Sequence, residues 1–303
     1  MTRYRSVALF LGLAVLWGGS FPAIEVGLES FPPVLFAAAR YDLAGLFLLA
    51  YAVVAVDRWR PARGDLVGLA AAGVFLVAGN SLLFLGQQYT TGSLASVIYS
   101  LVPVLTTGFA WMLLPDERYS LVGLVGLLVG LAGVVVIARP DPANLLAADV
   151  VGKALVAMAA VSVALGGVLV QRADPTLPDS AFTGWAMLIG SAMLHVGSLA
   201  AGESIAAVDF APAGLAALAY IAVFATAVAF VIYFFLLGEY GSLETNLVSY
   251  VVPVVATALG WLLLDEIVTV WTGAGFLLIL GGFVLLKRRE LRAELRRART
   301  QRA

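Results

Sequence analysis

The chain of 303 residues contains no cysteine and a single histidine, His195. Without cysteine there can be no disulfide, thiolate metal site or cysteine nucleophile, and one histidine excludes a histidine-rich zinc or haem site. Charged residues are also scarce: Asp, Glu, Lys and Arg make up 12% of the chain, about half of their share in a soluble domain. From this composition we expect no metal and no other cofactor.

Hydrophobic residues take the place of the missing charge. They make up 62% of the chain, and the mean hydropathy is +0.99. A chain of this composition cannot cover itself with a water-soluble surface, so it is expected to be an integral membrane protein. The formal net charge of −1 argues against nucleic acid as a partner. The lipid bilayer is therefore the first partner to expect.

Ten apolar stretches are each about long enough to cross a bilayer, whose core of about 30 Å needs roughly 20 apolar residues per helix. Most Lys and Arg residues fall on one side of these spans, which predicts a multi-pass protein of the cell membrane with both termini in the cytoplasm. A basic tail, residues 288–303, follows the last span. The expected spans are residues 7–24, 34–56, 66–88, 94–114, 121–138, 150–170, 181–201, 213–237, 243–264 and 268–286.

The second half of the chain repeats motifs of the first. Gly92-Ser93-Leu94 returns as Gly241-Ser242-Leu243, a shift of 149 residues, and Asp116-Glu117 returns as Asp265-Glu266. Each half then holds five spans, and because five is odd the halves must lie in opposite orientations. The predicted fold is an all-α integral membrane protein of ten transmembrane helices, arranged as two inverted five-helix repeats over residues 5–138 and 150–287.

Glycines recur along the fifth span at intervals of three and four residues. This spacing places them on one helix face, where neighbouring backbones can approach closely. We expect this face to pack against the tenth span, which carries Gly275 and Gly282. The glycines of the fifth span are Gly123, Gly126, Gly130 and Gly133.

Inverted repeats are typical of secondary transporters, because two similar halves can exchange conformations and open a site to either side in turn. The sequence has no P-loop for ATP. It therefore predicts a secondary transporter that works by alternating access, and not an enzyme. A membrane-embedded enzyme or a lipid scramblase stays open as the alternative. An enzyme would need convergent ionisable groups, and the candidates Arg40, Asp42 and His195 do not share one segment.

A set of short motifs follows one order along the chain. With them, the sequence resembles the EamA-type ten-helix family of the drug/metabolite transporter superfamily over residues 5 to 287. The resemblance implies a 5+5 inverted-repeat transporter, mostly an exporter of amino acids or other small metabolites, with a central cavity lined by both halves. The motifs are Trp17-Gly18-Gly19-Ser20-Phe21, Arg40-Tyr41, Gln88-Tyr89-Thr90, Pro103 and Glu117 with Gly126 and Gly133, and the second half repeats the ending as Pro253, Glu266, Gly275 and Gly282.

Two departures from related carriers bear on the substrate. Asp42 stands where an apolar residue would be usual. No Lys or Arg lies between Arg172 and Lys287, so the late helices lack the basic residues with which related sugar-phosphate carriers hold phosphate. The expected substrate is therefore a small uncharged or zwitterionic metabolite.

Six residues within the spans are candidates for the substrate site. A buried guanidinium costs about 3 kcal/mol, so Arg40 is expected either to receive a substrate carboxylate or to reach the headgroups. Buried amides must bind either a neighbouring helix or a polar ligand. The aromatic rings can stack on a substrate or fill helix interfaces. The six candidates are Trp17, Arg40, Asn80, Gln87, Tyr99 and Tyr250.

Protons are the coupling ion considered, with Glu25 and Asp42 as candidate carboxylates. Glu25 lies at the end of the first span and is either a coupling group or a solvated residue at the mouth. Asp42 is rotated by about 200° from Arg40 on the same helix, so it needs another partner or a proton. His195 is expected either to carry a proton or to form a hydrogen bond inside the bundle. Association as a homodimer is left open.

Overall fold

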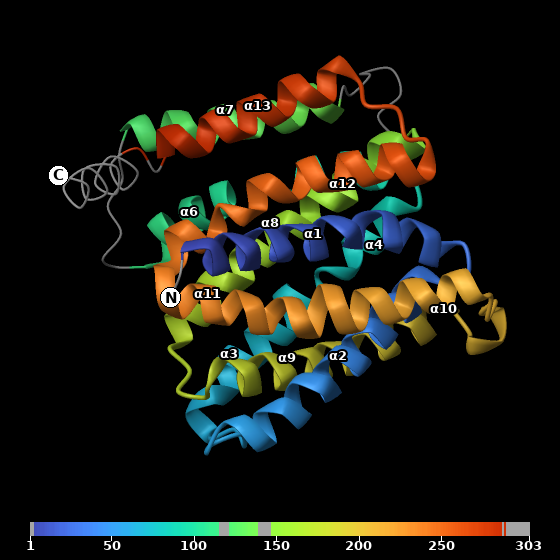
Figure 1. The fold of residues 1–303 in the computed structure, drawn as a ribbon, viewed down its shortest axis with the longest axis vertical. Coiled ribbons are helices and arrows are strands. Elements are labelled where there is room, and N and C mark those ends of the chain that lie inside the picture. The colour runs from blue at the N-terminus through green and yellow to red at the C-terminus, as the bar shows by residue number, and fades with distance from the viewer. Residues whose placement is uncertain (1–2, 115–120, 139–146, 287, 289–303) are drawn as a thin grey trace.

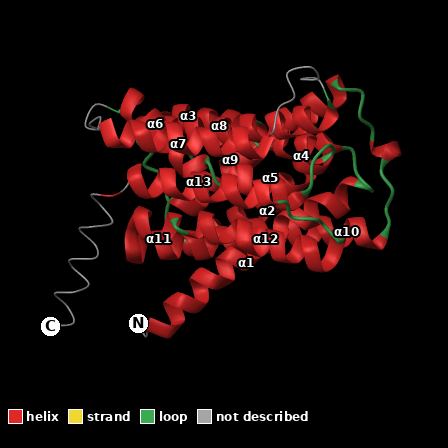
Figure 2. Cartoon of the chain, turned by 90° about the horizontal axis from the view of Figure 1, so that it is seen from above, coloured by secondary structure: helices red, strands yellow, loops and turns green. Residues whose placement is uncertain are grey.

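The computed structural model describes residues 3–114, 121–138, 147–286 and 288. Within these ranges the chain forms helices and no strand (Figure 2). Eight helical segments are long and apolar enough to cross a membrane, and two shorter apolar helices, Val248–Leu264 and Val270–Leu286, follow them. The prediction of an all-α membrane protein is confirmed.

The helices are numbered along the chain. Up to residue 138 they are α1 (Arg3–Leu28), α2 (Pro33–Ala55), α3 (Leu66–Ala71), α4 (Ser81–Gln87), α5 (Gly92–Tyr99), α6 (Val102–Leu113) and α7 (Leu121–Ala138). From residue 147 they are α8 (Ala148–Ala173), α9 (Asp179–Ala200), α10 (Pro212–Ala219), α11 (Ala229–Asn246), α12 (Val248–Leu264) and α13 (Val270–Leu286). Between them lie two 3-10 turns, η1 (Arg63–Asp65) and η3 (Ile205–Ala207), and two π-helical segments, η2 (Ala72–Ala78) and η4 (Tyr220–Val228).

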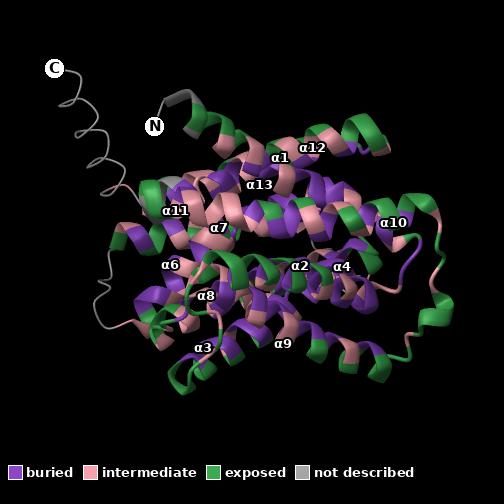
Figure 3. Ribbon diagram, turned by 60° about the horizontal axis from the view of Figure 1, so that its bottom comes forward, coloured by how far each residue is buried: buried purple, intermediate pink, exposed green. Residues whose placement is uncertain are grey.

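The outer surface of the bundle is largely apolar. Large hydrophobic side chains such as Val54, Leu121 and Val270 are at least 80% exposed, and the buried residues of the interior (Figure 3) are mostly hydrophobic as well. In water such a surface would be unfavourable, but lipid tails are as apolar as these side chains. The start of α1 and the end of α13 lie at the same end of the bundle (Figure 1).

α7 and α13 lie side by side along one edge of the bundle and meet backbone to backbone (Figure 1). A Cβ atom added to Gly126 would lie 2.6 Å from the carbonyl oxygen of Gly282, and one on Gly133 would lie 2.6 Å from that of Gly275. Because the earlier glycine of α7 meets the later glycine of α13, the two helices run antiparallel. The predicted glycine packing of the fifth span against the tenth is confirmed.

α2 and α9 also pack against each other, and each receives a carboxylate from the loop that follows the other. Glu203, after α9, accepts hydrogen bonds from the backbone N–H groups of Val34 (3.1 Å) and Leu35 (2.8 Å) in the first turn of α2. N–H groups at the start of a helix have no partner within the helix, so a carboxylate there is stabilising.

The matching contact lies at the other end of α9. Asp65, after α2, accepts hydrogen bonds from the backbone N–H groups of Thr176 (2.8 Å) and Leu177 (3.2 Å), just before α9 begins. It also accepts from Ala62 and pairs with Arg58. The two carboxylates thus fix the ends of the α2–α9 pair from opposite sides.

Three of the expected spans differ from a plain α-helix. The third and eighth contain the π-helical segments η2 and η4, where bonds such as Gly79 N–H to the Val74 carbonyl (2.7 Å) span five residues. The fourth is divided into α5 and α6. Pro103 lies in the first turn of α6, where its missing N–H costs nothing, whereas Pro253 stays inside α12.

The expected boundary between the eighth and ninth spans is wrong. The sequence predicted that the eighth span ends at residue 237, but α11 continues through Gly238 and Gly241 to Asn246. A glycine costs a helix only about 1 kcal/mol relative to alanine, so two glycines did not end it. The turn falls at Leu247 instead.

Candidate functional site

Three residues from separate helical segments form a hydrogen-bonded chain inside the bundle. The side-chain amide of Asn80, in the turn before α4, donates from Nδ2 to the hydroxyl of Tyr41 on α2 (2.8 Å). Its Oδ1 accepts from the hydroxyl of Tyr99 on α5 (2.8 Å). We call Tyr41, Asn80 and Tyr99 the polar chain. An amide nitrogen has two N–H groups, so Asn80 keeps one for a further acceptor.

Arg40 lies beside this chain and points into the bundle. Its guanidinium lies over the rings of Tyr41 (5.0 Å) and Phe84 (5.7 Å), and its Nε donates to Oγ1 of Thr226 in η4 (2.9 Å). Arg40 is 8% exposed and forms no ion pair with a residue in the described ranges. A buried cation is thus held by neutral groups, which leaves its charge available to an anion.

Gln87 reaches the same region from α4. Its Nε2 donates to the backbone carbonyl of Phe21 (3.0 Å), while its Oε1 is buried without a hydrogen-bond partner. The Phe21 ring in turn contacts Tyr99, with ring centroids 6.2 Å apart. Gln87 therefore offers one acceptor oxygen next to the polar chain.

The other two aromatic candidates lie apart from this group. Trp17 packs against Tyr233 and Phe230 of α11, at ring-centroid distances of 5.4 and 6.1 Å. Tyr250 packs against Phe283 of α13 at 4.6 Å, and its hydroxyl is buried without a partner. The structure brings Arg40, Asn80, Gln87 and Tyr99 together, and it does not bring Trp17 or Tyr250 to them.

Asp42 points away from Arg40, as its position on the helix predicted. Its carboxylate lies 2.7 Å from Nε2 of His195 on α9 and also accepts a hydrogen bond from the hydroxyl of Ser191. The Asp42 and His195 side chains are 36% and 44% exposed at the seam between α2 and α9. The sequence pointed to both residues but gave no sign that they pair.

These three side chains do not form a nucleophilic triad. In a triad the serine donates its proton to the histidine, and the histidine donates to the carboxylate. Here Ser191 and His195 both bind Asp42. No group of three or more His, Cys, Asp and Glu residues that would suit a metal ion occurs in the ranges that the structure describes.

Glu25 lies at the end of α1 and meets the N-terminus of α5. Its Oε2 accepts a hydrogen bond from the backbone N–H of Gly92 (2.8 Å). The next N–H, that of Ser93, is bound by Oε2 of Glu266 (3.0 Å), which comes from the segment between α12 and α13. The sequence identified Glu266 only as part of the repeated motif. Its burial could not be inferred from that motif.

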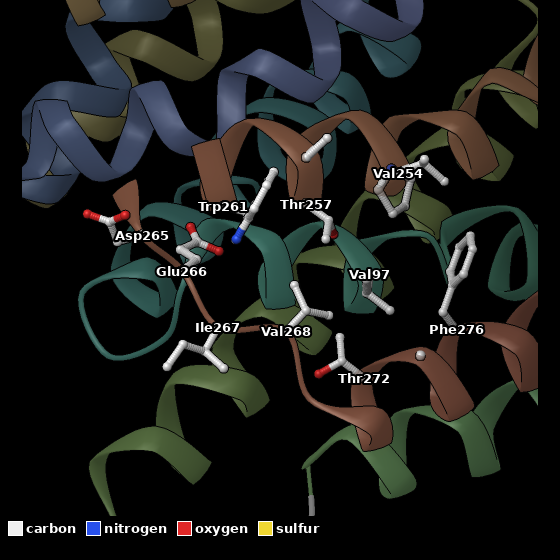
Figure 4. A pocket seen from close by; sticks show the side chains of 13 residues that line it. Val97, Val254, Thr257, Trp261, Asp265, Glu266, Ile267, Val268, Thr272 and Phe276 are labelled. Atoms are coloured by element: carbon white, nitrogen blue, oxygen red, sulfur yellow. The ribbon is translucent and has the colours of Figure 1, made fainter. Parts of the chain in front are cut away.

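Two pockets open near the ends of the bundle. One of about 700 Å³ lies between α5, α12 and α13, and Thr257, Trp261, Glu266 and Thr272 are among its walls (Figure 4). The other, of about 540 Å³, lies at the opposite end, near Arg5, where α1 begins. None of the six candidate residues lines either pocket.

An apolar exterior and helices long and apolar enough to cross a membrane define a helical multi-pass membrane protein. The family model described as the EamA-like transporter family matches residues 5–139 and again residues 150–288. The chain therefore belongs to the EamA-like transporter family, whose members are membrane transporters.

Named relatives agree with this assignment. The chain is 30% identical over 265 residues to the uncharacterized inner membrane transporter YedA of Escherichia coli (strain K12), a match that covers 85% of this chain and 84% of YedA. It is 26% identical to the uncharacterized transporter YvbV of Bacillus subtilis (strain 168), over 94% and 92% of the two chains. A solved crystal structure is similar in fold, with a TM-score of 0.66 and 21% identity over 97% of this chain and 100% of that one.

Proposed function

We propose that this protein is a secondary transporter that exports a small uncharged or zwitterionic metabolite, an amino acid or a similar compound, by alternating access. The observation that carries the proposal is Arg40, a buried guanidinium with no ionic partner among the described residues. A guanidinium in this setting suits the carboxylate of a small zwitterion, because it can form two parallel hydrogen bonds with it.

The groups around Arg40 suit the rest of such a substrate. The free N–H of Asn80 and the unpartnered Oε1 of Gln87 offer one donor and one acceptor for polar groups of the substrate. The hydroxyl of Tyr99 binds the same Asn80 amide, and its ring contacts Phe21. Trp17 and Tyr250 stay in the proposal as aromatic contacts of the substrate, although their rings pack on α11 and α13, apart from Arg40.

The proposed architecture is ten spans in two inverted repeats, residues 5–138 and 150–287. Three features support it. Gly126 and Gly133 of α7 meet Gly282 and Gly275 of α13 in crossed order, as expected of equivalent helices in opposite orientation. A shift of 149 residues carries η2, residues 72–78, to residues 221–227, which lie within η4. The carboxylates Asp65 and Glu203 fix the ends of α2 and α9 reciprocally.

The protein is proposed to lie in the cell membrane, with both termini and the basic tail, residues 288–303, in the cytoplasm. The common end at which α1 starts and α13 ends supports an even number of crossings (Figure 1). Protons are the proposed coupling ion. Of the tail, the structure describes residue 288 alone, and Glu117 also lies outside the described residues. The proposed orientation therefore rests on the distribution of Lys and Arg.

The proposal can be tested on purified protein before any substrate is identified. Thermal unfolding is screened against a panel of amino acids and other small metabolites, and a ligand at 100 times its Kd adds about 2.7 kcal/mol of stability. Arg40→Ala should abolish stabilisation by a carboxylate-bearing hit, and Arg172→Ala, an exposed arginine at the end of α8, should not. Hits are then followed as efflux from proteoliposomes.

The alternatives make different predictions in the same preparations. A lipid scramblase would move labelled lipid between the leaflets of liposomes that contain no soluble substrate. A membrane enzyme would convert a hit rather than release it unchanged. Either result, together with no stabilisation by any metabolite, would contradict the transporter proposal.

A further inference from the structure

Two carboxyl groups from distant parts of the chain meet at the N-terminus of α5. Glu25 binds the N–H of Gly92 and Glu266 binds the N–H of Ser93, at 2.8 and 3.0 Å. Because these N–H groups are consecutive, the two carboxyl groups occupy neighbouring positions at the same helix N-terminus. We call Glu25 and Glu266 the carboxyl pair.

Two polar atoms in this place have no hydrogen-bond partner. They are Oε1 of Glu266 and Oγ of Ser93, on side chains that are 6% and 4% exposed. Both atoms pack closely against Gly260 of α12: a Cβ added there would lie 2.6 Å from Ser93 Oγ and 2.8 Å from Glu266 Oε1. Buried polar atoms in native structures nearly always have a hydrogen-bond partner. Two neighbouring buried atoms without one therefore indicate a place where a proton or another small group binds.

No described cation neutralises the carboxyl pair. Neither glutamate takes part in an ion pair with another described residue. The charged groups on neighbouring elements are Glu29, one turn beyond Glu25, and Asp265, next to Glu266, both of which add negative charge. On α8, which packs against α5, Lys153 is already bound to Asp149 at 3.0 Å. Tyr99 on α5 binds Asn80, and Tyr250 on α12 packs on α13.

We propose that the carboxyl pair binds one proton and that this proton holds this end of the bundle closed. The inference rests on the proposed function as a secondary transporter. A single proton gives the pair an O–H donor, which one carboxyl supplies to the other, and it removes the repulsion between two adjacent negative charges. Water at this end of the bundle supplies the proton and later receives it, so only an O–H bond forms and breaks.

The pair can couple proton binding to movement because it joins two separate parts of the bundle. Glu25 belongs to α1, and Glu266 belongs to the segment between α12 and α13. With the proton bound, the two carboxyls hold these parts together, whereas two ionised carboxylates repel each other and favour separation. Proton affinity therefore differs between the closed and open states of this end, which is the requirement for coupling.

The direction follows from the proposed orientation, in which this end faces outward. After the substrate leaves to the outside, an external proton joins the carboxyl pair and closes the outer end. Loss of the proton lets it open again. Glu266 also borders the pocket of about 700 Å³ beside α12 and α13, which gives solvent an approach to the pair (Figure 4). Because the proton binds and leaves on the same outer side, external pH sets how readily this end opens.

Infrared spectroscopy of the purified protein tests the proton site without any substrate. A protonated carboxyl has a carbonyl stretching band that disappears when the proton leaves. The chain has 19 Asp and Glu residues, and each gives such a band in acid, so the diagnostic band is one that persists at neutral pH, where ordinary carboxylates are ionised. We expect the wild-type protein to show this band, and Glu25→Gln and Glu266→Gln each to lose it. Glu29→Gln, an exposed glutamate one turn further along the chain, is the matched control and should retain it. A neutral-pH band that survives in either pair variant overturns the proposal, and so does its absence from the wild type.

A second variant keeps both carboxyls and so covers the case in which a glutamine variant fails to fold. In Gly260→Ala the new methyl group would lie 2.6 Å from Ser93 Oγ and 2.8 Å from Glu266 Oε1, so these two side chains must shift. We expect the band to titrate at a different pH in this variant, and an unchanged titration contradicts the proposed site.

The effect of the proton on opening is tested in proteoliposomes loaded with a hit from the metabolite screen. Lower external pH should slow efflux in the wild type and in Glu29→Gln, because it favours the closed outer end. Glu25→Gln and Glu266→Gln should lose this dependence on external pH and still transport down a gradient. If both variants keep the full dependence, the role in closure is wrong. If a metabolite binds but no carboxyl band is seen, this inference is wrong and the proposed function still holds. If the band is seen but no metabolite binds, the proposed function is wrong.

Discussion

His195 Nε2 lies 2.7 Å from Asp42 Oδ2 across the contact between α2 and α9. The residues are 153 positions apart, and both side chains are partly exposed on a surface that is otherwise apolar. A polar side chain without a hydrogen-bond partner is costly in lipid, and each of these two residues lowers that cost for the other by binding it. Ser191 adds a second donor to Asp42. The contact is therefore expected to hold the two helices together.

Removal of either partner should lower the thermal stability of the protein. We expect His195→Ala and Asp42→Asn each to cost about 1–3 kcal/mol, the penalty of an unpaired polar group. Because the two residues act on each other, the double variant should cost less than the sum of the single variants. Thermal unfolding of the wild type, the two single variants and the double variant in one detergent measures this interaction energy. Strictly additive losses of stability would show that the contact between the two residues does not contribute.

Two adjacent glycines on α13 offer a matched comparison. In Gly282→Ala the new Cβ would lie 2.5 Å from the carbonyl oxygen of Gly126, so α7 and α13 would have to separate. Gly281 has no atom within 4 Å of the same position. We expect Gly282→Ala to destabilise the protein by about 1–3 kcal/mol, as overpacking does, and Gly281→Ala to leave the melting temperature unchanged or higher. Equal melting temperatures for the two variants would contradict the close contact.

Gln87 and Tyr250 test the substrate site. We expect Gln87→Ala and Tyr250→Ala each to weaken binding of a screened metabolite by about 1–3 kcal/mol, the cost of a lost polar or stacking contact. Gln171→Ala, an exposed glutamine on α8, is the control and should bind normally. Calorimetry on folded variants measures the affinities. Unchanged affinity in substitutions of all six candidate residues would remove this site from consideration.

The orientation can be tested because the chain has no cysteine. In intact cells, an impermeant thiol reagent should label Glu203→Cys, in the segment after α9, and spare Arg299→Cys, in the basic tail. The ten-span model with both ends inside fails if position 299 is labelled and position 203 is not.

Local patterns predicted much of this fold. Charge scarcity and ten apolar stretches are properties of composition, and the glycine spacing of α7 needed only helix geometry to predict its packing against α13. The segments η2 and η4 were missed because a π-helix has no simple residue pattern. Contacts such as Asp42–His195 were missed because they depend on which helices pack together, which no local pattern records.

The candidate site was less predictable than the fold. A buried amide such as Gln87 must find a partner, but its partner is the backbone carbonyl of Phe21, and any residue type would have supplied that atom. Glu266 follows Asp265 after α12, a position that predicts solvent exposure, yet it is 6% exposed because it folds back onto α5. Such a turn toward the bundle depends on the tertiary structure.

The contact between α7 and α13 has a mechanical consequence. Helices usually slide past one another by small shears of the side-chain layer between them. Where Gly126 meets Gly282 and Gly133 meets Gly275 there is no such layer, because backbone lies directly on backbone. These two helices are therefore expected to move together as one rigid body, relative to which the remaining helices rotate.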